Sequence, residues 1–115
     1  RFPANNAGVS WDPTNGPDIY PEIKIGQTSV WASPYYSQDA NSNLDYEFIP
    51  SPEVDLTSPE VLHSISLYDY DDLDADDFMG LVYFKPYSSV SGFPAVITVD
   101  AGGPVAFRLH VSYVW

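Results

Sequence analysis

The chain has 115 residues, a formal net charge of −12 and only four basic side chains. This length is typical of one domain with its own hydrophobic core, which we expect to span residues 1–115. The lack of cysteine excludes disulfides and zinc–thiolate sites, and the scarcity of Lys and Arg argues against nucleic-acid partners and against simple attraction to anionic lipid.

Short segments of alternating polarity, broken by eleven prolines and seven glycines, predict β-strands and no long helix. In chain order, we expect strands at residues 22–25, 28–32, 44–49, 61–68, 79–84, 95–99 and 105–115. We expect loops at residues 33–43, 50–59 and 85–93. The last two strands flank a glycine-rich turn, which predicts a hairpin. This pattern favours an all-β chain that folds as an antiparallel β-sandwich of seven to eight strands.

The feature with the clearest chemical meaning is a run of six aspartates within nine residues. The run reads Asp69-Tyr70-Asp71-Asp72-Leu73-Asp74-Ala75-Asp76-Asp77 and is followed by Phe78-Met79-Gly80. So many like charges repel one another unless they face open water or surround a hard cation. Closely spaced carboxylates suit Ca²⁺, which takes about six to eight oxygen ligands.

A second acidic segment lies near the start of the chain, where Asp12 and Asp18 flank Gly16. Each of the two acidic segments lies next to the start or end of predicted strands. Because such loops gather at one end of a sandwich, we expect aspartates from both segments to share one or more Ca²⁺ ions. Half of the 16 acidic residues of the chain lie in these two segments.

An EF-hand is the obvious alternative for such a run, and it fits poorly. That loop needs acids at positions 1, 3 and 5, Gly at position 6 and Glu at position 12. A loop that starts at Asp69 has Leu73 at position 5, and one that starts at Asp72 has Asp77 at position 6. Neither start finds Glu at position 12, and no flanking helices are predicted.

The two segments instead resemble the metal loops of a C2 domain, of a divergent, secreted bacterial kind. Asp12 and Asp18 have the Asp-x5-Asp spacing of the first loop, and residues 69–80 match the second loop, which reads Asp-aromatic-Asp, then Asp, two apolar residues and Gly. The resemblance implies an eight-stranded antiparallel sandwich. It also implies Ca²⁺ ligands at Asp12, Asp18, Asp69, Asp71, Asp74 and Asp77. Asp72 and Asp76 would then face outward without a role.

The chain departs from the C2 pattern near its first residues. Ile19 stands where a proline commonly follows the second aspartate, and Arg1 and Phe2 are too few to form the first strand of the family. Either that strand is missing, or a neighbouring molecule supplies it, or the topology is shifted. No signal peptide is visible in the sequence, and its abrupt start at Arg1 leads us to expect a mature or excised product.

We expect a non-catalytic, calcium-binding module, because no motif of an active-site nucleophile or of a catalytic metal is present. The scarcity of lysine favours an extracellular or cell-surface location, where Ca²⁺ is abundant. The module would serve assembly or adhesion, with identical subunits as partners. The first alternative is Ca²⁺-dependent binding to phospholipid, which the negative charge disfavours. The second is Ca²⁺-dependent binding to carbohydrate, with candidate stacking residues Trp11, Trp31, Tyr35, Tyr36 and Tyr46.

Overall fold

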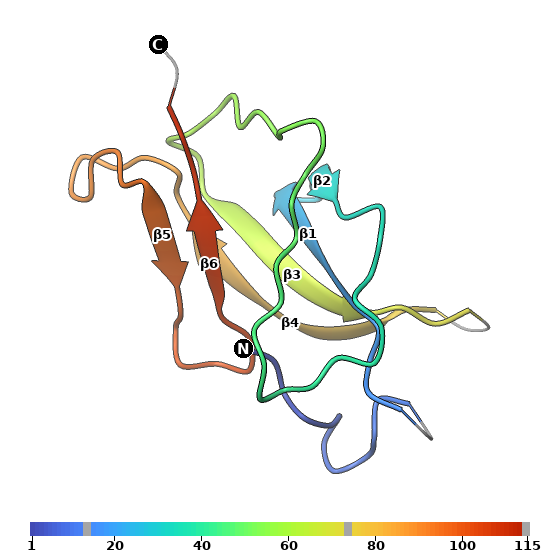
Figure 1. Ribbon diagram of the computed structural model, residues 1–115. Helices are drawn as coiled ribbons and strands as arrows, with labels where there is room; N and C mark the ends of the chain where they lie inside the picture. Colours follow the sequence, from blue (N-terminus) through green and yellow to red (C-terminus); the bar gives the residue numbers. More distant parts are fainter. Residues whose placement is uncertain (13–14, 73–74, 114–115) are drawn as a thin grey trace.

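The computed structural model describes residues 1–12, 15–72 and 75–113, and these residues form six β-strands in two antiparallel sheets (Figure 1). The strands are β1 (Ile19–Ile25), β2 (Thr28–Ala32), β3 (His63–Asp69), β4 (Asp77–Phe84), β5 (Val96–Val99) and β6 (Phe107–His110). The large sheet has the order β2-β1-β3-β4, and the small sheet pairs β5 with β6. No helix that could span a membrane occurs in the described part of the chain.

The predicted all-β class is confirmed, and so is the antiparallel hairpin formed by the last two strands. Five of the predicted strands correspond to β1 to β5, and the bounds of β2 are those expected from the sequence. The prediction of seven to eight strands was too high, because the described residues form six. Of the seven predicted ranges, residues 44–49 form no strand, and the described part of the range from residue 105 onward contains only the short strand β6.

Residues 44–49 form no strand, although their alternation is real. Tyr46 and Phe48 pack against the core, whereas Leu44 and Ile49 are 58% and 63% exposed. The segment belongs to the long connection from β2 to β3, which passes in front of the large sheet (Figure 1). It therefore covers the core with side chains without joining either sheet through a backbone ladder.

The predicted strand at residues 105–115 is shorter than its alternation suggested, since β6 covers four residues. Its partner β5 is equally short, and one further backbone hydrogen bond, from the N–H of Val111 to the carbonyl of Ala95 at 3.0 Å, lies beyond the ladder. Val105 precedes β6 and is fully buried in the core, while residues 114 and 115 lie outside the described residues. The alternation of apolar residues thus indicates which side chains are buried, and it extends beyond the residues that pair as a strand.

The core lies between the inner face of the large sheet and the small sheet with its adjoining loops. Its buried members are Phe2, Ile19, Ile23, Ala40, Ile65, Leu67, Met79, Val82, Phe84, Val99 and Val105. In β1 and β3 every second side chain points to this face, as the period of a strand requires. Each fully buried aliphatic or aromatic side chain contributes about 1.5–3 kcal/mol to folding.

Gly80 allows the segment before β6 to pack closely on β4. Its φ is +145°, and a Cβ atom there would lie 3.1 Å from both Pro104 Cγ and Val105 Cγ1. The register of β3 against β4 also shifts beside Gly80, between Leu67 and Tyr68. Glycine is favoured at this position because other residues rarely adopt this backbone conformation and a Cβ atom would press on Pro104 and Val105.

The first residues of the chain form no strand before Asp12. Arg1 instead pairs with Ala106, with hydrogen bonds of 2.9 and 3.0 Å between their backbone groups, and Phe2 is buried in the core. The chain start therefore adds a single residue pair beside β6, in place of the full strand that the C2 pattern expects.

Candidate metal centre

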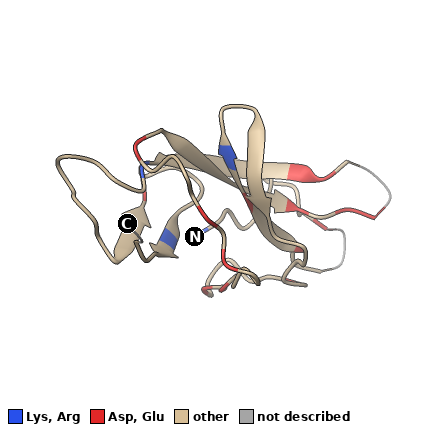
Figure 2. Ribbon diagram, turned by 90° about the horizontal axis from the view of Figure 1, so that it is seen from above, with Lys and Arg blue, Asp and Glu red and all other residues tan. Residues whose placement is uncertain are grey.

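Three strand ends bring the two acidic segments to one end of the large sheet. β1 begins directly after Asp18, β3 ends at Asp69 and β4 begins at Asp77. Asp69 lies opposite Ile19 on one side and opposite Asp77 on the other. Figure 2 shows acidic residues at the ends of these strands, beside the grey loops. The ladder of the sheet is thus the reason that aspartates distant in sequence become neighbours.

A hydrogen bond joins the two acidic segments directly. The backbone N–H of Asp18 donates to Oδ1 of Asp69 at 2.8 Å, across 51 positions of sequence. The N–H of Tyr70 in turn donates to the backbone carbonyl of Asp18 at 2.8 Å. Asp69 is only 3% exposed, so this carboxylate lies at the border between the core and the acidic loops. The pair fixes the two segments relative to each other.

Like charges and burial raise the pKa values of two carboxyls in this region. Burial is the largest cause that raises the pKa of Asp69, to about 6. The charges of Asp12, Asp18 and Asp77 raise this pKa further, whereas the hydrogen bond from the backbone of Asp18 lowers it. The pKa of Asp12 is also raised. Burial is the largest cause, followed in order by the charges of Asp18, Asp71, Asp39 and Asp77. Asp12 and Asp71, which come from different segments, are therefore close enough to interact. The region gathers negative charge that no basic side chain compensates among these causes.

Asp39 also belongs to the group of aspartates around Asp12 and Asp18, although the sequence did not predict it as part of the site. Its backbone N–H donates to Oδ1 of Asp18 at 3.0 Å, and the N–H of Ala40 donates to the carbonyl of Pro17 at 2.7 Å. Gly16 makes this contact possible, because a Cβ atom there would collide with the carbonyl oxygen of Ala40. A single acid in a polar loop gives no signal in the sequence, since the contact depends on how the loop folds back.

The expectation that Asp76 faces outward without a role was wrong. Its Oδ1 accepts a hydrogen bond from the N–H of Asp71 at 3.0 Å, and its Oδ2 accepts one from the hydroxyl of Tyr20. Asp76 therefore ties the acidic loop to β1. Asp72 is exposed, as expected, and a hydrogen bond from Tyr70 to it raises the pKa of that tyrosine.

The structure brings together five of the six predicted ligands, and Asp74 lies outside the described residues. Among the residues described, no three His, Asp or Glu side chains form a group that could hold a metal ion as they stand. The carboxylates are thus neighbours that interact through their charges without closing around a common point. Their donor atoms are all oxygen, which is the chemistry that Ca²⁺ prefers. Movement of the loops would be needed to complete a coordination shell.

The five aromatic residues considered for carbohydrate stacking do not form one surface. Trp11, Trp31 and Tyr46 pack against the core, and the indole N–H of Trp11 donates to the carbonyl of Pro3 at 2.9 Å. Only Tyr35 and Tyr36 lie together, beside the acidic loop. The core role of the other three follows the general tendency of aromatic side chains to fill sandwich interiors.

No family model matches the chain, and the searches of curated proteins and of solved structures gave no match either. The resemblance to a C2 domain therefore remains a prediction from the spacing of residues in two loops. The geometry of the acidic region stands independently of it, because it follows from the described strands and hydrogen bonds.

Proposed function

We propose that the chain is a non-catalytic, calcium-binding module of a secreted or cell-surface protein, and that Ca²⁺ stiffens one end of its β-fold. The observation that carries this proposal is the meeting of two acidic segments at the hydrogen bond from Asp18 to Asp69. The ladder of the large sheet holds the two segments together although the charges of their aspartates repel. A shared cation would offset this repulsion.

The ligands in this proposal are the six aspartates of the two segments. They are Asp12, Asp18, Asp69, Asp71, Asp74 and Asp77. Backbone N–H groups already bind one oxygen each of Asp18 and Asp69, which leaves the second oxygen of each carboxylate for the ion. Asp39 adds negative charge from a third segment without being a required ligand. Ca²⁺ suits this arrangement because it accepts irregular oxygen shells.

Calcium binding would be coupled to stability. Without the ion, the crowded carboxylates oppose folding, and an ion that binds only the folded state stabilises it by mass action. At a free Ca²⁺ concentration of about 100 times Kd, this contribution is about 2.7 kcal/mol. The role that we propose is therefore structural, as part of an assembly or an adhesive surface.

Contacts with identical subunits fit the open edges of the sheets. The large sheet ends in β2 on one side and β4 on the other, and the small sheet has only two strands. An open edge presents unpaired backbone groups to which another strand can add. Analytical ultracentrifugation with Ca²⁺ checks this part of the proposal, and a monomer that persists at high protein concentration would contradict it.

Calorimetric titration with Ca²⁺ tests the central part of the proposal. We expect saturable binding to the native chain and at least about tenfold weaker binding to Asp71→Asn, which keeps the size of the side chain and removes its charge. Asp100→Asn is the matched control, because it removes one charge far along the chain from both acidic segments. Equal affinities of the two variants would contradict the assignment of Asp71.

A further inference from the structure

A shallow pocket of about 370 Å³ lies beside the acidic loop, on the face of the large sheet that points away from the core. Its lining includes Tyr20, Tyr35, Tyr36, Tyr70 and Asp76. Tyr20 stands between the buried residues Ile19 and Pro21 of β1, so its ring projects from the outer face. No Lys or Arg belongs to the lining among the described residues.

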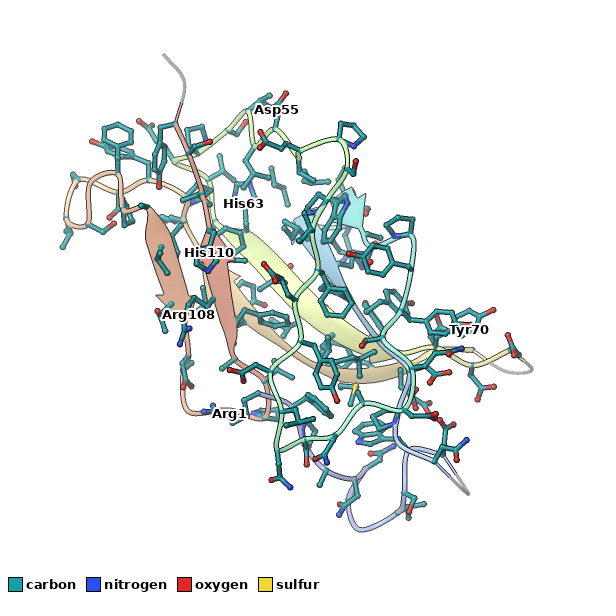
Figure 3. All side chains as sticks on the ribbon, in the orientation of Figure 1. Arg1, Asp55, His63, Tyr70, Arg108 and His110 are labelled. Atoms are coloured by element: carbon teal, nitrogen blue, oxygen red, sulfur yellow. The ribbon has the colours of Figure 1, made fainter. Side chains whose placement is uncertain are left out.

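Backbone pairing brings the tyrosines together. Ile19 and Ser37 exchange two backbone hydrogen bonds of 3.0 and 2.8 Å, which places Tyr36 next to Tyr20. Tyr70 directly follows the end of β3, at the end of the sheet where the acidic loop leaves it (Figure 3). The rings of Tyr36 and Tyr70 are stacked, with centroids 4.5 Å apart and planes 11° from parallel.

The other two rings, of Tyr20 and Tyr35, each stack on an aromatic residue outside the pocket lining. Tyr20 stacks on Tyr68 with centroids 5.4 Å apart, and Tyr35 stacks on Phe48 with centroids 6.0 Å apart. Each ring that lines the pocket therefore has one face against a neighbouring ring. The walls are formed before any ligand arrives, so binding costs little ordering of side chains.

Hydrogen bonds to carboxylates make this pocket attractive to a cation. The hydroxyl of Tyr20 donates to Asp76 Oδ2, and Tyr70 has a hydrogen bond to Asp72. A phenol that donates to a carboxylate becomes richer in electrons, which strengthens the attraction of its ring for positive charge. The carboxylate of Asp76 adds a full negative charge at the pocket itself.

The kind of cation follows from the lining, in which four aromatic rings accompany a single carboxylate. Asp76 is the one carboxylate of the described lining, and each of its oxygens already accepts one hydrogen bond, so it offers few of the acceptors that an N–H-rich cation needs. A primary ammonium needs about three acceptors and a metal ion needs several oxygens. A methylated ammonium needs none, because methyl groups cover its charge and pack against aromatic faces.

We propose that this pocket binds a quaternary, methylated ammonium group of the kind carried by choline. The pocket contains none of the proposed calcium ligands, although Asp76 accepts a hydrogen bond from the N–H of Asp71 and so shares the acidic loop with them. Four tyrosine rings and one carboxylate are the recurring components of sites that recognise such groups.

Titration with choline chloride, followed by NMR of the tyrosine rings in buffers with and without Ca²⁺, tests the proposal. Ethanolamine lacks the methyl groups, and 3,3-dimethylbutan-1-ol has the shape of choline without its charge. At matched ionic strength, we expect choline to bind in the millimolar range and both analogues to bind at least about tenfold more weakly. Choline that binds no more tightly than the neutral analogue would overturn the proposal.

Two variants that each remove one charge locate the site. We expect Asp76→Asn to weaken choline binding about tenfold and Asp100→Asn to change it less than about twofold. Because Asp76 also holds the acidic loop, Tyr36→Leu provides a second test, in a side chain that contributes its ring to the pocket through stacking on Tyr70. Unchanged choline affinity in both Asp76→Asn and Tyr36→Leu would contradict the assigned pocket.

Vesicles distinguish a free ligand from a lipid headgroup. Sedimentation with phosphatidylcholine vesicles is compared with sedimentation with phosphatidylglycerol vesicles, each with and without excess choline. Binding to phosphatidylcholine that choline displaces supports a lipid source of the methylated ammonium, and binding of free choline alone supports a soluble source. Vesicle binding that choline leaves unchanged, together with no binding of free choline, would contradict the proposal.

Discussion

Negative charge is balanced differently in two regions of the molecule, the turn between β5 and β6 and the end of the large sheet where the acidic segments meet. In the turn, the guanidinium of Arg1 donates to both carboxylate oxygens of Asp100, at 2.9 and 2.6 Å. This pairing, aided by the N–H of Gly102, lowers the pKa of Asp100. At the end of the large sheet, burial and neighbouring carboxylates raise the pKa of Asp69 to about 6.

The contrast shows that the acidic residues of this chain are of two kinds, those paired with a basic side chain and those clustered with other carboxylates. Asp100 has its counter-charge within the chain, so its charge is satisfied when the protein folds. The aspartates around Asp69 have backbone donors as partners, and their charges add to one another. A region of the second kind gains stability from an external cation, whereas a region of the first kind does not.

Calcium is expected to have the largest effect on stability. Addition of Ca²⁺ to about 100 times Kd should stabilise the native chain by about 2.7 kcal/mol, which corresponds to a rise in Tm of roughly 10 °C for a chain of this size. Scanning calorimetry measures the shift. Asp100→Asn should show the same rise as the native chain, because its charge lies in the paired region. A rise of similar size with Mg²⁺ alone would show that the site does not select calcium.

Gly80→Ala should destabilise the attachment of the small sheet while it leaves calcium affinity unchanged. The new Cβ atom would meet Pro104 and Val105 at 3.1 Å in a backbone conformation that favours glycine. We expect a loss of about 2 kcal/mol in the free energy of unfolding, measured with urea. Gly103→Ala is the matched control, since nothing lies within 4 Å of its Cβ position. Equal losses in both variants would contradict this account of Gly80.

The stability of the protein in EDTA should fall as the pH rises from about 4 to about 7. A carboxyl whose pKa is raised on folding, as for Asp69, stabilises the protein at low pH, and this contribution is lost as the pH passes through about 6. Asp100, whose pKa is lowered, acts in the opposite direction and only below about pH 4. Urea titrations at several pH values measure the trend. Asp69→Asn should flatten it, and a native chain that gains stability over this range would contradict the prediction.

Arg1→Ala should have the smallest effect, a slight loss in the free energy of unfolding, because exposed ion pairs contribute little. Both Arg1 and Asp100 are exposed at the surface, so water screens the ion pair that they form. The loss should shrink in 1 M NaCl, which chemical denaturation with urea at two salt concentrations would reveal. A loss that stays constant with salt would indicate that the packing of the Arg1 stem matters more than its charge.

The parts of the fold that depend on local alternation of polarity could be predicted from sequence. The parts that depend on which other segment of the chain a strand pairs with could not. The bounds of β2 and the β5–β6 hairpin followed from alternation and turn residues. Residues 44–49 alternate in the same way, yet whether such a segment finds a neighbouring strand is decided by the whole fold.

The candidate site shows the same division. The spacing of Asp12, Asp18, Asp69 and Asp77 predicted that two segments meet, and the pairing of Ile19 with Asp69 brings them together. The approach of Asp39 depends on a loop that folds back over Gly16, and the bonds of Asp76 depend on where Tyr20 points. Neither contact has a spacing that sequence alone could reveal.

A double-mutant cycle in calcium affinity tests the central claim most directly. Calorimetric titrations of the native chain, Asp12→Asn, Asp71→Asn and the double variant measure whether the two aspartates share an ion. We expect each single variant to weaken binding at least about tenfold, and the double variant to lose clearly less than the product of the two single losses. Losses that multiply independently, or no heat of binding at millimolar Ca²⁺, would contradict the claim that aspartates from two remote segments bind one ion together.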